Sequence, residues 1–116
     1  MNKENTREQE KLLLAQVVKQ DKKAFEQLYQ LTSKSVYFYL YRLLQNRESA
    51  EDIHVEVYAQ VWKNAANFKG QSRVKTWIFG IARNLALNEI RRESIRRTQE
   101  LHDVHKDTQT QDAVAQ

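Results

Sequence analysis

The sequence of 116 residues contains no cysteine and no proline, and only two glycines, Gly70 and Gly80. Without cysteine the chain has no disulfide framework and no thiolate that could bind a metal or act as a nucleophile. A β-rich chain of this length would need more turn residues, so the composition favours an all-α fold. No apolar run approaches the roughly 20 residues of a membrane span, and the polar N-terminal residues lack the apolar stretch of a signal peptide. We therefore expect a soluble, cytoplasmic protein.

The sequence also lacks the motifs that carry common catalytic chemistry. It has no glycine-rich phosphate loop, no His-Glu-x-x-His motif and no nucleophile elbow. Its histidines are His54, His102 and His105. The last two lie in the polar segment least suited to a packed core, so we expect no metal site there. His54 is expected on a helix surface. We predict no enzyme activity and no cofactor.

Apolar residues recur at helical spacing in five segments. The first ends near Gln20, and Asp21 is expected to cap a short second helix. A third segment begins after Thr32 and Ser33. Ser49 with Asp52 resembles a capping box that opens the fourth helix, and the fifth starts from Ser72. These patterns predict a compact bundle of four to five helices over residues 1–97, followed by a polar linker or tail over residues 98–116.

Gly80 lies inside the fifth predicted helix, where glycine costs about 1 kcal/mol relative to alanine. The close approach of another helix or of a ligand would explain it. A tolerated defect is the alternative, and the sequence does not decide between them.

Positive charge is concentrated near the end of the predicted domain. The segment from Lys69 to Arg97 holds eight cations against Glu89 and Glu93, a net charge of 8 − 2 = +6, whereas the whole chain carries +4. Aromatic residues, such as Phe68 and Phe79, lie among these cations. Single-stranded nucleic acid offers both phosphate charge and exposed ring faces, so the combination favours such a partner. A solvated basic helix is the alternative.

Two asparagines in the same helix add a more specific signal. Asn84 and Asn88 are separated by one helical turn and are poor helix-interior residues. An amide carries donors and an acceptor and can read the edge of a base, while Arg83 and Arg91 can contact phosphates. Trp77 also fits the apolar stripe of the helix, so burial in the core is an alternative role for it.

The fourth predicted helix has a polar stripe. Asp52, Glu56 and Gln60 follow each other at intervals of four residues. A solvated face is the default interpretation of such a stripe, and a ridge that binds a basic partner is the alternative.

Five short motifs in order resemble a known family, domain 2 of bacterial sigma factors of the extracytoplasmic-function (ECF) group. The likeness runs from about Leu13 to Arg97. The motifs are Ala50-Glu51-Asp52-Ile53, Glu56-Val57-Tyr58-x-x-Val61-Trp62, Phe68-Lys69-Gly70-Gln71-Ser72, Thr76-Trp77-Ile78 and Ile81-Ala82-Arg83-Asn84-Leu85-Ala86.

This resemblance implies a transcription initiation domain with two binding faces. The helix Ser49–Ala66 would dock on the clamp helices of the beta-prime subunit of core RNA polymerase. The loop Asn67–Arg73 and the next helix would recognise and melt the promoter minus-ten element, and would capture its non-template strand. In the family, an asparagine at the position of Asn84 helps to hold a base turned out of the stack.

The implied contacts divide between these faces. The polymerase contacts are Asp52, Glu56 and Gln60. The DNA contacts are Phe68, Lys69, Ser72, Arg73, Lys75, Trp77, Arg83, Asn84, Asn88, Arg91 and Arg92. By position, Phe68, Lys69 and Ser72 would line the pocket, while most of the others would face the backbone or neighbouring bases. The resemblance also implies an anti-sigma factor as a partner, and no membrane insertion.

The sequence departs from the family in two places. The family usually has glutamine where this chain has Val55, which puts one polar contact with polymerase in doubt. Complete members carry a second helical domain, and nothing after Arg97 can form one. We therefore expect a fragment that ends in the interdomain linker, and a naturally short protein is the alternative. Two other functions remain open: an interaction module held by an anti-sigma factor or scaffold, and a single-strand binder without sequence preference.

Overall fold

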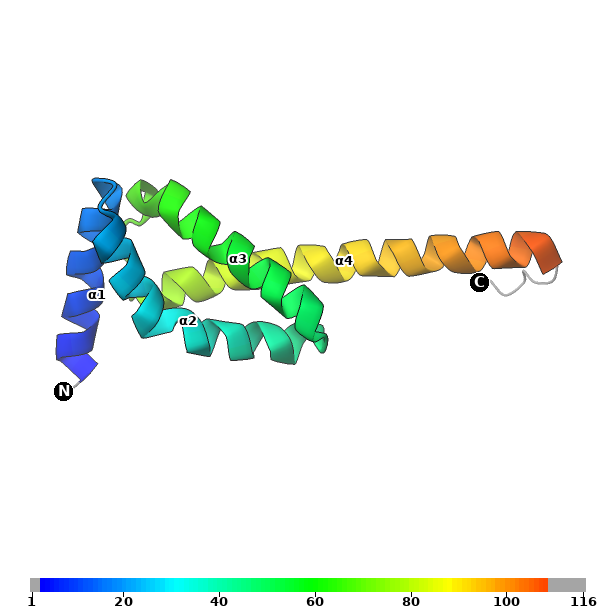
Figure 1. Cartoon of the computed structure of the whole chain (residues 1–116), viewed down its shortest axis with the longest axis horizontal. Coiled ribbons are helices and arrows are strands. Elements are labelled where there is room, and N and C mark those ends of the chain that lie inside the picture. Colours follow the sequence, from blue (N-terminus) through cyan, green and yellow to red (C-terminus); the bar gives the residue numbers. More distant parts are fainter. Residues whose placement is uncertain (1–2, 109–116) are drawn as a thin grey trace. The chain divides into compact units, whose positions relative to one another are not determined.

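The computed structural model describes residues 3–108, which form helices and no strand (Figure 1). The elements are α1 (Lys3–Val18), α2 (Lys22–Leu44), α3 (Arg47–Asn64), the short 3-10 helix η1 (Ala65–Asn67) and α4 (Val74–Thr108). The predicted all-α fold is confirmed. The chain divides into two compact units, the first ending at Ala86 and the second beginning at Leu87.

A tight corner joins α1 to α2. Gln20 adopts a left-handed φ of 69°, and Asp21 then caps α2. The Asp21 carboxylate accepts hydrogen bonds from the backbone N–H groups of Lys23, at 3.0 Å, and Ala24, at 3.2 Å. These bonds satisfy donors that a helix start leaves without partners, which confirms the predicted cap.

The predicted break at Thr32 and Ser33 is wrong, because α2 continues through both residues. Thr32 is fully buried, and its hydroxyl donates to the Leu28 carbonyl at 3.0 Å. A threonine bonded in this way stays inside a helix and often bends it. Figure 1 shows α2 changing direction along its length. Two predicted helices are therefore one helix.

The start of α3 also differs from the expectation. Asn46 is the cap, and its side-chain oxygen accepts the Ser49 backbone N–H at 2.9 Å. Ser49 thus lies in the first turn and is not the cap. The preceding residue, Gln45, closes α2 in a left-handed conformation with a φ of 54°. Asparagine and serine are about equally good N-caps, so the sequence alone did not distinguish Asn46 from Ser49. The predicted helix therefore began about one turn too late.

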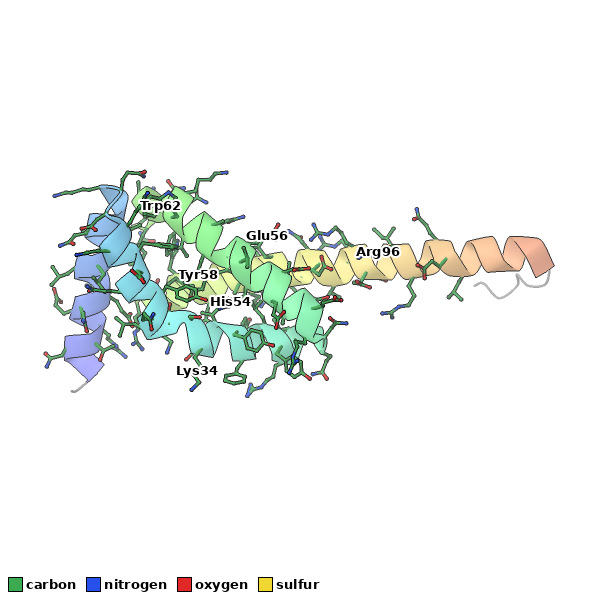
Figure 2. All side chains as sticks on the ribbon, in the orientation of Figure 1. Lys34, His54, Glu56, Tyr58, Trp62 and Arg96 are labelled. Carbon is green, nitrogen blue, oxygen red and sulfur yellow. The ribbon has the colours of Figure 1, made fainter. Side chains whose placement is uncertain are left out.

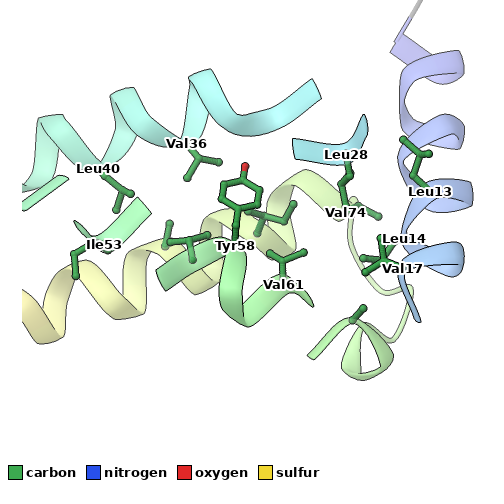
Figure 3. Close-up of a cluster of buried hydrophobic side chains, with 14 of the residues drawn as sticks. Leu13, Leu14, Val17, Leu28, Val36, Leu40, Ile53, Tyr58, Val61 and Val74 are labelled. Atoms are coloured by element: carbon green, nitrogen blue, oxygen red, sulfur yellow. The ribbon is translucent and has the colours of Figure 1, made fainter. Parts of the chain in front are cut away.

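The hydrophobic core of the first unit draws on all four α-helices (Figure 3). In α1 the buried residues are Leu13, Leu14 and Val17. In α2 they are Ala24, Leu28, Val36 and Leu40. In α3 and η1 they are Ala50, Ile53, Val57, Tyr58, Val61 and Ala65, and in α4 they are Val74, Ile78, Ala82 and Ala86. Spacings of three and four residues place each group on one helix face.

A polar cluster lies between α2 and α3, inside this core. The Tyr58 hydroxyl lies 2.6 Å from Thr32 Oγ1, whose own proton goes to Leu28, so Tyr58 donates. Burial raises the pKa of Tyr58 to about 12, although the Thr32 hydroxyl, which could turn toward a phenolate, opposes this rise. Tyr58 is therefore a neutral donor at physiological pH.

His54 belongs to the same cluster, so its predicted surface position is wrong. Its side chain is only 9% exposed, and Nε2 lies 3.0 Å from the Ser33 carbonyl oxygen. A carbonyl only accepts, so Nε2 carries a proton. The rings of Tyr29, Tyr37 and Tyr58 surround the imidazole. Figure 2 shows His54 and Tyr58 on the side of α3 that faces α2.

Beyond Val74, the buried stripe of α4 within the first unit consists of one large aliphatic residue and two alanines. Ile78, Ala82 and Ala86 are fully buried, whereas Ile81 and Leu85 are half-buried beside them. Small alanine side chains allow the helix backbone to lie close to its neighbours. Ile81 and Leu85 pack against the core at the edge of this stripe.

Gly80 has open space around it, since no described atom lies within 4 Å of the place where an added Cβ would stand. No neighbouring helix therefore requires a glycine there. Gly70 also has space, but its φ of +76° lies in the left-handed region that favours glycine.

We predict that Gly80→Ala stabilises the protein by about 1 kcal/mol, because alanine is the better helix former and nothing obstructs its methyl group. The free energy of unfolding in urea measures this gain. Gly70→Ala is the matched control and should destabilise the protein, because of its positive φ. A loss of stability in Gly80→Ala would contradict the placement of Gly80 in open helix surface.

The second unit begins within α4, and the helix continues to Thr108, past the expected domain boundary at Arg97. No proline or glycine interrupts this segment, so no residue type forces the helix to end. The side chains of His102 and His105 and all of residues 109–116 lie outside the described part. The division into a domain over 1–97 and a linker over 98–116 stays a prediction. None of the helices within residues 3–108 is long and apolar enough to cross a bilayer.

Candidate nucleic-acid interface

The loop between η1 and α4 is anchored by an aromatic pair. The Phe68 and Trp77 rings meet edge to face, with centroids 5.6 Å apart. Both side chains are half-buried and pack against the core. The tryptophan therefore contributes to the core, as its place on the helix suggested, and also supports the phenylalanine of the loop. Each ring keeps part of its surface open to solvent.

The middle of the loop is exposed and turns at Gly70. Lys69, Gln71 and Ser72 are all open to solvent. The Ser72 hydroxyl donates to the Arg73 carbonyl at 3.1 Å, and the same carbonyl accepts the Trp77 N–H at 3.0 Å. These bonds tie the end of the loop to the first turn of α4. The loop presents a cation and polar groups from a backbone that is fixed at both ends.

Arg73 is held by a buried carboxylate from α1. Its Nε and Nη2 atoms donate to the two Glu10 carboxylate oxygens at 3.2 and 2.9 Å. Glu10 is 1% exposed, whereas the Arg73 side chain is 28% exposed. A two-pronged pair of this kind fixes direction as well as distance. The pair therefore fastens the loop to α1, 63 residues away in the sequence.

The sequence interpretation missed Glu10. Its position falls on the face that carries Leu13, Leu14 and Val17, three, four and seven residues later. A lone carboxylate in such an apolar register predicts a buried partner cation, because an unpaired buried charge is very costly. Helical register was therefore the signal that could have identified it.

Beyond the loop, α4 carries polar residues that were predicted to contact the DNA strand. Arg83 and Asn84 are exposed, and Lys75 is half-exposed. Among the described side chains, none forms an ion pair with Lys69, Lys75 or Arg83, and none bonds to the Asn84 amide. These groups are consequently available to a ligand. No described contact joins Asn84 to Phe68.

The other three predicted DNA contacts belong to the second unit. Arg91 donates to the Asn88 side-chain oxygen at 3.1 Å, and Arg92 pairs with Glu89 at 2.7 Å. The two arginines are exposed, so the bonds are weak and exchange readily with water. Glutamates next to the arginines lower the net positive charge of this stretch.

The predicted polymerase face lies on α3. Asp52 and Glu56 are exposed, and in the part of the chain that the structure describes neither carboxylate has an ion pair. Gln60 is half-exposed, and Val55 is 70% exposed. Figure 2 shows Glu56 on the side of α3 away from the cluster of His54 and Tyr58. An acidic face with an exposed apolar residue at its edge is therefore open to a partner.

Comparison with known proteins gives a family match across most of the helical region. A model of the family described as Sigma-70 region 2 matches residues 28–96. The chain is 32% identical over 85 residues to the ECF RNA polymerase sigma factor SigX of Bacillus subtilis (strain 168), covering 73% of this chain and 44% of the relative. It is 33% identical over 89 residues to the ECF RNA polymerase sigma factor SigK of Mycolicibacterium vanbaalenii, covering 76% and 45%. The chain thus spans less than half the length of these relatives.

Proposed function

Because the chain belongs to the sigma-70 region 2 family, we propose that it is a non-catalytic transcription initiation domain. It binds core RNA polymerase through α3, and recognises and melts the promoter minus-ten element through the loop and α4. The observation that carries the proposal is a set of groups on the loop and α4 of the first unit that no described side chain pairs. The cations of Lys69 and Arg83 and the amide of Asn84 lie in the same segment as the paired rings of Phe68 and Trp77.

Each of these groups has a separate task in holding an unpaired strand. Lys69, Lys75 and Arg83 neutralise phosphates and supply affinity without sequence preference. Phe68 and Ser72 line the pocket for a base that has left the stack. Extrusion costs a few kcal/mol, which a stacked ring and amide hydrogen bonds offset. Asn84 supplies those amide bonds and, with them, the sequence preference.

The remaining predicted residues act in supporting roles. Arg73 fixes the loop through its ion pair with Glu10, and Trp77 supports the Phe68 ring through an edge-to-face contact. Asn88, Arg91 and Arg92 of the second unit contact the backbone or neighbouring bases.

The acidic face of α3 supports polymerase binding. Asp52, Glu56 and Gln60 would meet basic residues on the clamp helices of the beta-prime subunit. Val55, in place of the usual glutamine, adds an exposed apolar group beside that face. The domain would act in the cytoplasm without membrane insertion, and an anti-sigma factor would regulate it.

Retention on immobilised core RNA polymerase tests the α3 face. We predict that Asp52→Arg or Glu56→Arg lowers retention by about tenfold or more, because like charges across an interface cost several kcal/mol. Glu26→Arg, an exposed carboxylate on α2, is the matched control and should be retained like the wild type. Unchanged retention of both α3 variants would exclude this docking face.

Equilibrium binding to short single strands tests the strand face. Strands that carry a minus-ten element should bind more tightly than strands with the same bases in permuted order. Phosphate contacts from Lys69, Lys75 and Arg83 predict a slope of about −2 in a plot of log affinity against log salt. Salt-dependent binding with no sequence preference would instead identify a generic single-strand binder. No strand binding, with a partner protein still bound, would identify a protein-interaction module.

A further inference from the structure

The loop that is proposed to capture a base, residues 68–73, is held at both of its ends. At the start the Phe68 ring meets Trp77, and at the end the Arg73 guanidinium donates to Glu10 of α1. The four residues between these contacts are exposed to solvent. The path of the loop therefore depends on the contact with α1 as well as on the ring pair.

Glu10 reaches the loop from a fixed position. Its carboxylate is buried and lies in the apolar register of α1, three residues before Leu13. Figure 3 shows Leu13 at the same end of the core as Val74, the first residue of α4. Arg73 directly precedes Val74 in the chain. The ion pair therefore joins α1 to the point where the loop enters α4.

Stability alone does not account for a carboxylate in this place. A buried ion pair is often no more stabilising than two apolar side chains of similar volume. The pair adds direction, because Nε and Nη2 of Arg73 donate to different oxygens of Glu10, at 3.2 and 2.9 Å. An apolar contact would fill the same space without fixing the orientation of the side chain at position 73.

A fixed loop matters more to a base than to a phosphate. A site that is ordered before its ligand arrives avoids the entropic cost of ordering on binding. Lysine side chains such as Lys69 are flexible and can follow a phosphate from several loop positions. Ring stacking and hydrogen bonds to a base depend on direction, so the pocket residues Phe68 and Ser72 need a defined loop path. Loosening the loop should therefore impair base capture more than phosphate binding.

We propose that Glu10 is a positioning residue for base capture. Through Arg73 it keeps the loop in the geometry in which Phe68 and Ser72 receive the base, and Glu10 itself does not touch the strand. This inference rests on the proposed capture of a single strand by the loop and α4. It brings α1 into strand recognition, although Glu10 lies outside residues 28–96, which match the family.

Strand binding by the double variant Glu10→Leu/Arg73→Met separates positioning from stability. Two apolar side chains leave no buried charge, so this variant should keep most of the wild-type stability. Because the directed bonds are lost, its affinity for a minus-ten strand should fall about tenfold, the cost of ordering one or two side chains on binding. Its affinity for permuted strands should change little. Fluorescence anisotropy with labelled strands measures both affinities.

Glu10→Gln gives a second result, which is informative even if the double variant does not fold. Its preference for the minus-ten strand should also decline, because a neutral amide holds the guanidinium less firmly. Arg73 is 28% exposed and would then be a cation without its carboxylate. A phosphate can bind this cation, so the slope of log affinity against log salt should steepen by about 0.7. The double variant lacks the cation and should keep the wild-type slope.

Ile53→Val is the matched control for stability. Ile53 is buried in α3, and Figure 3 shows it at the end of the core away from Leu13 and Val74. The smaller side chain weakens the core without touching the loop. At a temperature where circular dichroism shows every variant folded, Ile53→Val should bind both kinds of strand like the wild type.

The outcomes separate this inference from the proposed function. Wild-type preference in both Glu10→Gln and the double variant would show that the pair serves stability alone, and would overturn the inference while the proposed function stands. A salt slope that becomes shallower by about 0.7 in the double variant would also overturn it, because Arg73 would then contact a phosphate in the wild type. No strand preference in the wild type would overturn the proposed function and the inference together.

Discussion

Replacement of Asn84 by alanine is expected to abolish discrimination between minus-ten strands and permuted strands. A good amide contact to a base edge is worth about 1–3 kcal/mol of discrimination, or roughly 5- to 150-fold. Without the amide, affinity for the preferred strand should fall to that for the permuted strands, while the salt dependence stays unchanged. Fluorescence anisotropy with labelled strands measures both quantities.

The stability of this variant should not confuse the result. The Asn84 side chain is exposed and has no hydrogen bond among the described residues, and alanine favours the helix by several tenths of a kcal/mol. Gln30→Ala, which removes an exposed amide from α2, is the matched control and should keep full discrimination. Undiminished discrimination in Asn84→Ala would assign the reading of bases to other residues.

Arg73→Ala is expected to destabilise the protein by about 3–5 kcal/mol, because it leaves the Glu10 carboxylate buried and without its cation. Glu10 is 1% exposed, so in the intact protein its carboxylate depends on the guanidinium and not on water. Glu10→Gln should cost less, because Arg73 is 28% exposed and can be hydrated. Urea denaturation gives the free energy of unfolding of both variants. We predict a larger loss of stability in Arg73→Ala than in Glu10→Gln.

An exposed pair in the same protein supplies the comparison. Arg92→Ala removes an arginine that is 59% exposed and lies 2.7 Å from Glu89. Because exposed ion pairs contribute about 0–1 kcal/mol, this variant should be nearly as stable as the wild type. Equal losses in Arg73→Ala and Arg92→Ala would contradict the structural role of Glu10. The double variant Glu10→Leu/Arg73→Met should recover much of the loss, since it leaves no buried charge.

Features with local causes were predictable from the sequence. The cap at Asp21 depends on backbone N–H groups two and three residues later, and the exposure of Asp52 and Glu56 follows from helical register. The all-α fold followed from the scarcity of turn residues. Each of these inferences needs only composition or neighbours within one or two helical turns.

Features that depend on distant residues were not predictable in this way. Thr32 resembled a helix break, but Tyr58, 26 residues later, gives it a buried partner inside α2. His54 resembled a surface residue, but the Ser33 carbonyl and three tyrosine rings enclose it. Such polar residues become core residues only through partners that the fold supplies.

The candidate site shows the same division. Helical spacing placed Asn84 and Arg83 on open helix surface, because exposure depends on a single helix. A hollow between α2 and α4, by contrast, needs Phe38 and Tyr41 from α2 together with Phe79 from α4. Tyr39 and Phe79 pack against the core, whereas Phe38 and Tyr41 lie off the buried face of α2 and are exposed. Only the packing of two helices shows that their rings border open space.

The most direct test of base capture is an abasic scan of the preferred strand, with the binding affinity measured for each position in turn. Loss of a base that is held in a pocket should lower affinity roughly 5- to 150-fold at that position, with smaller losses at the other positions. In Asn84→Ala this loss should shrink markedly. Small and equal losses at every position, unchanged by Asn84→Ala, would show that the domain stacks on any strand, and would contradict the account.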